Sequence, residues 1–271
     1  QKLTDSIGKY IVIDNRGGAN GNIGTGIAAK APNDGYTLLL TGAGLVTNPS
    51  LYSKVSFDPV KDFDPISLLA LAPNILVVHP SVPVKSVAQL VALAKARPGD
   101  VYYSSAGSGS TPHLAAELFK IMAKVDLLHV PYKGSGPALI GVLSGEVSIM
   151  FPAAIFAVPH VTAGRLRALA VTSVSRLPVT PELPTIAESG FKGYESSQWY
   201  GVLAPTGTAD DILNLLNSHI VKIMQAADMK QQLINTGSVA VGSTREEFAA
   251  HIRAEIVKWA KVIKDSGARV D

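Results

Sequence analysis

Short apolar runs alternate with segments of helical periodicity through the middle of the chain. The apolar runs predict strands at 101–104, 127–130, 147–151 and 166–172. The periodic segments between them predict helices at 112–123, 136–143 and 155–163. Because connections of only a few residues join these elements, the alternation favours a parallel sheet with helices on both faces.

Strands and helices are also predicted on both sides of this region. Further strands are expected at 10–14, 36–40, 74–78 and 199–205, and further helices at about 23–30, 86–96 and 211–225. A last helix begins at Thr244, where the sequence Thr-Arg-Glu-Glu is typical of a capping box, and it carries an apolar stripe. The run from Ile75 to Val78 is apolar throughout, as expected of a strand buried on both faces.

This order of elements predicts an α/β fold of two lobes, each with a central sheet flanked by helices. Strands near Val78 and Trp199 would join the lobes, and the C-terminal helices would complete the first one. We therefore expect lobe 1 to comprise residues 1–78 and 200–271, and lobe 2 to comprise residues 79–199. Ligands of such folds bind at the carboxyl ends of strands, often between lobes.

Composition and charge exclude several classes of protein. With 271 residues, 47% of them apolar and 17% charged, the chain is long and apolar enough for a well-buried core. The formal charge of +3 is scattered along the chain, so nucleic-acid binding is not expected. The absence of cysteine from the sequence excludes disulfides, thiol nucleophiles and cysteine-ligated zinc. No apolar run reaches the roughly 18 residues that span a bilayer.

The stretch most suggestive of ligand binding is SSAGSGSTPHLAAELFK, residues 104–120. It predicts a strand end, a loop of small polar residues and a helix, with Thr111 as N-cap and Pro112 as the first helical residue. Glycines let the loop backbone approach a ligand, and N–H groups and hydroxyls at a helix start favour an anion such as a carboxylate. An ordinary capped turn fits the same pattern, and the sequence leaves both interpretations open.

A serine hydrolase is another interpretation of this loop. Ser108 and Ser110 lie in the glycine-rich part, and His113 follows one helical turn later. The pattern is not G-x-S-x-G, however, and no acidic residue is placed to orient His113. We therefore expect His113 to face solvent or to cap the helix.

Nucleotide and metal sites are not expected. The stretch from Gly24 to Ala29 matches a loose G-x-G-x-x-A, but it does not follow a strand directly, and the next acid, Asp34, comes too early. Of the six histidines, no two lie four residues apart, and none forms an H-E-x-x-H set. The sequence therefore indicates neither a cofactor nor a metal.

Six stretches of the sequence are more specific together than any of them is alone. They are IVIDNRGGANG (11–21), DGYTLL (34–39), NPSLY (48–52), HVPYKG (129–134), LPTIAESG (183–190) and the segment 199–205 with WYG and AP. Together they resemble the Bug-type receptors, the periplasmic solute-binding proteins of tripartite tricarboxylate transporters in Gram-negative bacteria. The likeness extends from about residue 3 to the end of the chain.

The resemblance implies a two-lobed Venus-flytrap fold of the type II periplasmic-binding kind, which closes over a small carboxylate by hinge motion. It also implies a monomer in the periplasm, no catalysis, and delivery of the solute to the membrane subunits of a tripartite tricarboxylate system. The positions that match the family's ligand loops are Thr41 and Gly42 in lobe 1, Ala106, Gly107, Ser108, Ser110 and Thr111 in lobe 2, and Phe151 near the cleft.

Two departures from the family pattern change this expectation. Members begin with a strand and a loop that contributes to the carboxylate site. This chain opens with Gln-Lys-Leu-Thr, which is not a secretory leader. We expect it to start inside the helix that follows the strand and loop in other members. Members often carry an aspartate where this chain has Pro152. Because the ammonium group of an amino acid would need such an acid, we expect a dicarboxylate or an aromatic carboxylate. The effector-sensing domain of a regulator shares the two-lobed design but requires a helix-turn-helix, which this sequence does not encode.

Overall fold

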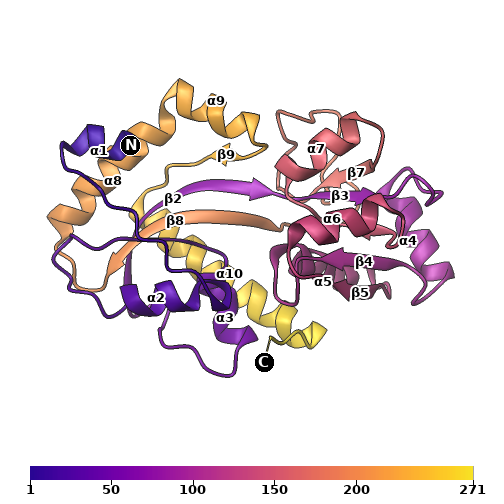
Figure 1. The fold of residues 1–271 in the computed structure, drawn as a ribbon, viewed down its shortest axis with the longest axis horizontal. Coiled ribbons are helices and arrows are strands. Elements are labelled where there is room, and N and C mark those ends of the chain that lie inside the picture. Colours follow the sequence, from indigo (N-terminus) through magenta and orange to yellow (C-terminus); the bar gives the residue numbers. More distant parts are fainter. Residues whose placement is uncertain (271) are drawn as a thin grey trace.

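The structure, a computed structural model, describes residues 1–270 as two lobes, each built around its own sheet (Figure 1). The first sheet has the order β1–β8–β2–β9, and all of its pairs are antiparallel. Its strands are β1 (Leu39–Gly42), β8 (Ser197–Pro205), β2 (Phe63–Pro73) and β9 (Val239–Ala240). β2 and β8 pair from Phe63 opposite Pro205 to Pro73 opposite Ser197; β2 runs toward the second lobe and β8 runs away from it (Figure 1).

The sheet of the second lobe is mixed rather than wholly parallel. Its strands, in spatial order, are β5 (Leu128–Pro131), β4 (Tyr102–Ser105), β6 (Ile149–Met150), β3 (Ile75–Val78) and β7 (Arg167–Val171). β4 is parallel to β5 and β6, as predicted, but β3 is antiparallel to β6 and β7. β3 lies outside the region for which a parallel sheet is predicted, and it is antiparallel because it continues directly from β2 through Asn74, without a helical crossover.

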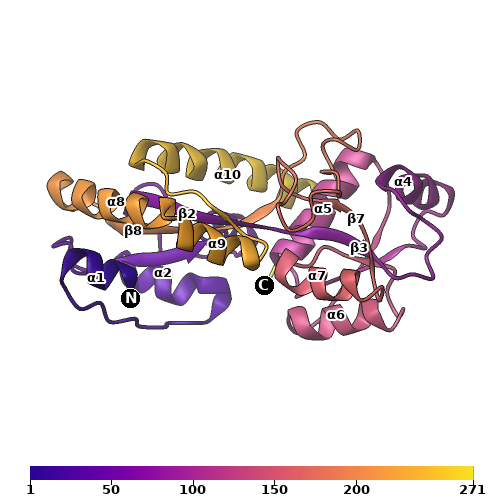
Figure 2. The ribbon, with the colours of Figure 1, turned by 90° about the horizontal axis from the view of Figure 1, so that it is seen from above.

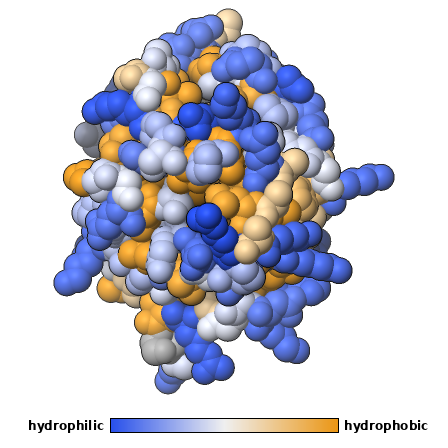
Figure 3. Space-filling view, turned by 90° about the vertical axis from the view of Figure 1, so that its right-hand side faces the viewer, coloured by the Kyte–Doolittle hydropathy of each residue, from blue (hydrophilic) through white to orange (hydrophobic). Residues whose placement is uncertain are grey.

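Helices cover both faces of the second sheet (Figure 2). α4 (Val87–Ala96) and α5 (Thr111–Ala123) lie on one side, and α6 (Ser135–Leu143) and α7 (Ala154–Thr162) lie on the other. These bounds agree closely with the helices that the sequence predicts. On the end face of this lobe, hydrophilic side chains project outward and hydrophobic ones lie between them (Figure 3).

The helices of the first lobe pack around its sheet and reach the second lobe. They are α1 (Lys2–Ile7), the 3-10 turn η1 (Ala19–Gly21), α2 (Asn22–Ala28), α3 (Gly44–Leu51), α8 (Asp210–Gln225), α9 (Ala227–Asn235) and α10 (Arg245–Ser266). α8 packs on β2, whereas α10 contacts β2, α3 and also α5 of the second lobe. α10 therefore connects the two lobes by packing as well as closing the first.

The start and the inner face of α10 follow from its sequence. The Thr244 hydroxyl accepts a hydrogen bond from the Glu247 N–H, and the Glu247 carboxylate accepts one from the Thr244 N–H, which completes the predicted capping box. The predicted stripe is buried at Phe248, Ile252 and Trp259. Each such side chain stabilises the fold by roughly 1.5–3 kcal/mol through removal of apolar surface from water.

Two chain segments cross between the lobes next to each other. Asn74 separates β2 from β3, and its N–H donates to the Thr172 hydroxyl, which in turn donates to the Asn74 carbonyl. The Ser196 N–H, just before β8, donates to the Thr172 carbonyl. The Thr172 side chain therefore bonds to the crossing segment at Asn74, and the Thr172 carbonyl bonds to the crossing segment at Ser196.

Several elements differ from the sequence prediction. The segment 10–14 is not a strand: its side chains Tyr10, Val12 and Ile13 are strongly exposed, and it pairs with no strand among residues 1–270. β-Branched residues favour a strand only where a neighbouring strand or a packed face is present. The long strand β2 and the helix α3 were not predicted, because Pro65 and Pro73 in β2 and Pro49 in α3 resemble loop punctuation.

Candidate functional site

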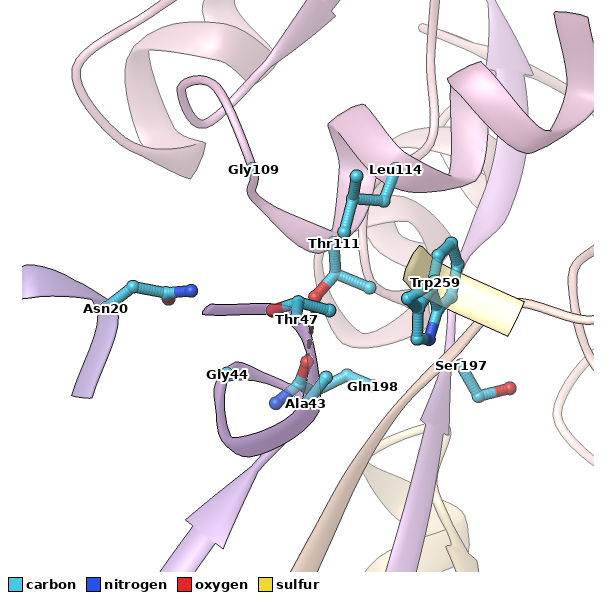
Figure 4. A pocket seen from close by; sticks show the side chains of 10 residues that line it. All are labelled: Asn20, Ala43, Gly44, Thr47, Gly109, Thr111, Leu114, Ser197, Gln198 and Trp259. Carbon is cyan, nitrogen blue, oxygen red and sulfur yellow. Dashed lines mark hydrogen bonds between the residues drawn. The ribbon is translucent and has the colours of Figure 1, made fainter. Parts of the chain in front are cut away.

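A small cavity lies where the two lobes meet (Figure 4). About 50 Å³ of it is open to the centres of water molecules, which is room for a few waters or for one end of a small organic acid. Its lining comes from the starts of α3, α5 and β8, from the η1 turn, and from α10. The lining residues are Asn20, Ala43, Gly44, Thr47, Gly109, Thr111, Leu114, Ser197, Gln198 and Trp259.

A hydrogen bond between the lobes crosses this cavity. Thr111, the first residue of α5, donates from its hydroxyl to the carboxamide oxygen of Gln198 in β8, at 2.7 Å. Because the oxygen of Gln198 is engaged, its NH₂ group is the end left to bind other partners; it has only a long contact of 3.4 Å to the Trp199 carbonyl. A Cβ at Gly42 would lie 2.3 Å from this NH₂ group, so β1 must end in glycine for Gln198 to fit.

Asn20 reaches the opposite side of the cavity from a tightly held turn. Its backbone has a φ of 53°, in the left-handed region that asparagine tolerates better than most residues. Its side-chain NH₂ donates to the Asn48 carboxamide oxygen at 2.8 Å, and the Asn48 NH₂ donates to the Asn20 carbonyl at 3.0 Å. Asn48 is buried, and a Cβ on Gly44 would lie 2.6 Å from the Asn20 carbonyl oxygen. The turn therefore depends on a buried amide partner and on a glycine.

The predicted glycine loop of the second lobe satisfies most of its own polar groups. The Gly107 N–H donates to the Ser105 hydroxyl at 3.1 Å, and the Ser110 hydroxyl and N–H both donate to the Gly107 carbonyl, at 2.6 and 3.2 Å. The Gly109 N–H donates to the His113 ring at 3.0 Å. The exposed Ser108 has no hydrogen-bond partner within the described part of the chain. The helix begins at Thr111 and not after it, so Ser110 is the N-cap residue, without a capping bond.

The predicted ligand residues therefore have different positions. Thr111 lines the cavity, Gly42 adjoins it through Gln198, and Thr41 pairs with Gly201 in the sheet. Ala106, Gly107, Ser108 and Ser110 belong to the loop that leads into the cavity. Phe151 is fully buried and packs with its ring centroid 5.9 Å from that of Phe119, in the core of the second lobe.

His113 lies inside the protein, contrary to the prediction that it faces solvent. It is 5% exposed and stacks on His129 of β5, with ring centroids 4.1 Å apart. Burial lowers the pKa of His113 to about 4, and the nearby Lys120 ammonium acts in the same direction. Burial also lowers the pKa of His129 to about 4; the charges of His113 and Lys120 add to this, and Glu117 opposes it.

The cavity lining carries no charged side chain. It offers carboxamides, hydroxyls and backbone N–H groups, together with the apolar surfaces of Leu114 and Trp259. The indole N–H of Trp259 donates to Glu255 at 2.8 Å and is therefore occupied. The Ser197 hydroxyl is buried and has no partner within residues 1–270. Such a lining can replace water around a carboxylate with neutral donors, but it offers no carboxylate to pair with an ammonium group.

The geometry does not favour a serine hydrolase. Ser108 bonds to no histidine, and the Ser110 hydroxyl is committed to the Gly107 carbonyl. The Ser–His contact in this region, 2.6 Å between Ser105 and His129, involves a fully buried serine. Over residues 1–270 there is no group of three or more potential metal ligands and no helix long and apolar enough to cross a membrane.

Several lining residues were missed by the sequence analysis. Gln198 and Trp259 come from segments far from the glycine loop, and only the tertiary structure brings them together with it. Asn20 could have been found, because it follows a pair of glycines in a run that suits left-handed backbone.

Comparison with known proteins gives one consistent result. Residues 1–268 match the family described as "Tripartite tricarboxylate transporter family receptor". Protein BugT of Bordetella pertussis is 37% identical over 270 residues, which cover 99% of this chain and 83% of BugT.

Two solved structures with bound acids have the same fold. The structure of R. palustris Rpa4515 with adipate has a TM-score of 0.85 and 39% identity, and the match covers 99% of this chain and 90% of that one. MatC (Rpa3494) from Rhodopseudomonas palustris with bound malate has a TM-score of 0.79 and 28% identity, over 97% of this chain and 90% of that one.

Proposed function

The chain belongs to the receptor family of the tripartite tricarboxylate transporters, and on this premise we propose that it captures a small organic carboxylate between its two lobes. The family consists of solute-binding receptors and not of enzymes. The solute would be a dicarboxylate or an aromatic carboxylate. The receptor would act as a monomer in the periplasm and deliver the solute to the membrane subunits of its transporter.

The observation that carries this proposal is the uncharged, donor-rich cavity between the lobes. Thr111 and Gln198 meet there from different lobes, and the Gln198 NH₂ group and the Asn20 turn border the same space. A carboxylate accepts hydrogen bonds only, so a lining of donors suits it. Relatives crystallised with adipate and with malate support the choice of dicarboxylates as the first candidates.

The remaining ligand residues and the lobe boundaries belong to the same proposal. The loop Ala106–Ser110 would border the ligand, with Thr41 and Gly42 on the first-lobe side, while Phe151 supports the second lobe from its core. The lobes would divide at the crossings Asn74 and Ser196, which lie close to the boundaries expected at 78 and 199. Hinge motion about these crossings would close the cavity over the ligand.

Calorimetric titration with a panel of acids tests the proposal. The panel contains adipate, malate, benzoate and phthalate, with aspartate and lysine as ligands that carry an ammonium group. We expect saturable binding of at least one of the first four and weaker binding of the two amino acids. Binding of lysine or aspartate in preference to all four acids, or no heat with any of them, would contradict the proposed function.

A further inference from the structure

Two stacked histidines lie directly beneath the glycine loop of the second lobe. His113 comes from the first turn of α5 and His129 from β5, and their ring centroids are 4.1 Å apart. Tyr103 of β4 also stacks on His129, at 4.8 Å, and its ring centroid lies 6.3 Å from that of His113. Each imidazole is connected to the loop by a hydrogen bond through a ring nitrogen.

The bond to His113 requires a neutral ring. The Gly109 N–H donates to Nδ1 of His113 at 3.0 Å, so this nitrogen must present a lone pair. The proton of the neutral ring is then on Nε2, which lies 4.0 Å from the Glu117 carboxylate. A second proton on the ring would occupy Nδ1 and leave the Gly109 N–H facing another donor.

The bond to His129 extends to the loop through a serine. Nε2 of His129 lies 2.6 Å from the Ser105 hydroxyl, whose oxygen is 3.1 Å from both the N–H and the carbonyl of Gly107. The serine hydroxyl can donate to a bare Nε2, or it can accept from a protonated Nε2 and donate to the Gly107 carbonyl, so this contact tolerates either state of His129. The two histidines thus fix Gly107 and Gly109, one directly and one through Ser105.

Gly109 has little freedom to move without changing the cavity. It lines the cavity, and a Cβ built on it would lie 2.7 Å from Leu51 Cδ1 of α3 and 3.1 Å from Val270 Cγ2. Its backbone therefore packs closely against the first lobe. A shift of this residue would disturb both the cavity wall and the contact between the lobes.

We propose that His113 and His129 are positioning residues for the loop 105–109, and that His113 holds Gly109 in its ligand-binding conformation only while its ring is neutral. Protonation of His113 releases Gly109 and lowers the affinity for the ligand. The effect on affinity rests on the proposed function, whereas the effect on the loop does not depend on any ligand.

The groups around the pair set the pH at which release occurs. Those that face it are Tyr103 of β4 and Glu117 and Lys120 of α5. Glu117 is held by the Tyr103 hydroxyl and by Lys120 at 2.8 Å, so its charge is shared among several partners. Since burial lowers the pKa of each histidine from about 6.5 to about 4, the rings stay neutral above about pH 5 and take up protons below it.

Ligand-free protein tests the positioning role by itself. Amide exchange and the chemical shift of Gly109 are followed by NMR from pH 7 to pH 3.5 in the wild type, H113N and H129Q. The oxygen of asparagine can replace Nδ1 of His113, and glutamine can replace Nε2 of His129, but neither titrates. We expect Gly109 to lose protection with a midpoint near pH 4 in the wild type and in H129Q, and no such titration in H113N.

H219N is the matched control, because His219 also bonds through Nδ1, to Ser6 at 2.6 Å, but lies in α8 of the first lobe. In H219N, the amide exchange and chemical shift of Gly109 should change with pH as they do in the wild type. Identical titration in H113N, or global unfolding by circular dichroism before Gly109 changes, would overturn the proposal.

Calorimetry with adipate then measures the effect on binding. We divide the dissociation constant of H113N by that of the wild type, at pH 7 and at pH 4. Protonation of adipate itself affects both constants equally and cancels in this ratio. The ratio should fall by about twofold at pH 4, because a histidine with a pKa of about 4 is half protonated there. An unchanged ratio would overturn the link to affinity. Absence of adipate binding at both pH values would count against adipate as the ligand, and the NMR result would still decide the positioning role.

Discussion

The side chains that meet in the cavity act through hydrogen-bond direction more than through charge. The Thr111 hydroxyl fixes the carboxamide of Gln198 by donating to its oxygen, and so selects the NH₂ group as the end that can serve a ligand. Neutral donors cost less to desolvate than a lysine or an arginine, and a closing cavity strengthens each bond to a carboxylate. At the scale of single residues, specificity for anions therefore depends on which end of an amide is left free.

Replacing Gln198 by glutamate tests this idea with almost no change of shape. In Q198E the oxygen that accepts from Thr111 is kept, and the NH₂ group becomes a second carboxylate oxygen. A negative charge about 4 Å from a bound carboxylate costs on the order of 4 kcal/mol in a partly buried site, so we expect binding to weaken at least about 100-fold. Calorimetry with the tightest-binding acid of the panel measures the loss.

Q89E is the matched control for this change. Gln89 is exposed, near the start of α4, and its side chain accepts only from the Lys85 N–H. Q89E should bind like the wild type. Equal affinity of Q198E and the wild type would show that Gln198 does not approach the carboxylate.

At the scale of elements, the contact between the α5 loop and α3 keeps the lobes together. Gly109 has a φ of 76° and lies against Leu51 at the end of α3. The Leu51 carbonyl also accepts the Val270 N–H at 3.3 Å. A glycine is required here for its backbone angle and for the lack of a side chain between the two elements.

We expect G109A to weaken ligand binding by about tenfold or more. Alanine in the left-handed region costs roughly 1–2 kcal/mol, and its methyl group would also push the loop away from Leu51. G193A is the control, because Gly193 has a φ of 87° but no atom within 4 Å of the added Cβ. Urea unfolding should show a similar loss of stability in both variants, and calorimetry a loss of affinity in G109A alone. Equal affinity in both would contradict the role of this contact.

The elements that the sequence predicts correctly are those whose burial is local. α4, α5 and α10 carry apolar stripes, α4 and α10 also have side-chain caps, and their bounds follow from these signals. The run 10–14 has the composition of a strand but no strand beside it, so propensity alone gave the wrong result there. The direction of β3 is likewise set by its continuation from β2, which no local pattern contains.

At the scale of the whole molecule, the site exists only because distant segments converge. Thr111 could be identified from its loop, whereas Gln198 and Trp259 become ligand candidates only when β8 and α10 reach the second lobe. The burial of His113 is equally a product of the tertiary structure, since β4 and β5 pack over the start of α5. The sequence therefore indicates the kind of ligand, and the fold supplies most of the residues that line the cavity.

The crossing segments explain how such a site can open. Asn74 and Ser196 are the two places where β2 leads to β3 and the chain returns to β8, and both bond to Thr172. In the hinge motion that we propose, a rotation about these neighbouring crossings would separate α5 from α3 without breaking either sheet. The bond from Thr111 to Gln198 would then form or break with closure, which would couple binding to closure.

Binding of a dicarboxylate compared with its diamide tests the central claim most directly. Adipate and adipamide have nearly the same shape, but only adipate carries a charged, acceptor-only group at both ends, whereas each amide end also donates. Calorimetry at pH 7 should show adipate bound at least about 100-fold more tightly, since charge-assisted hydrogen bonds are about twice as strong as neutral ones. Equal affinity for the two compounds, or tighter binding of adipamide, would contradict a site built from neutral donors for a carboxylate.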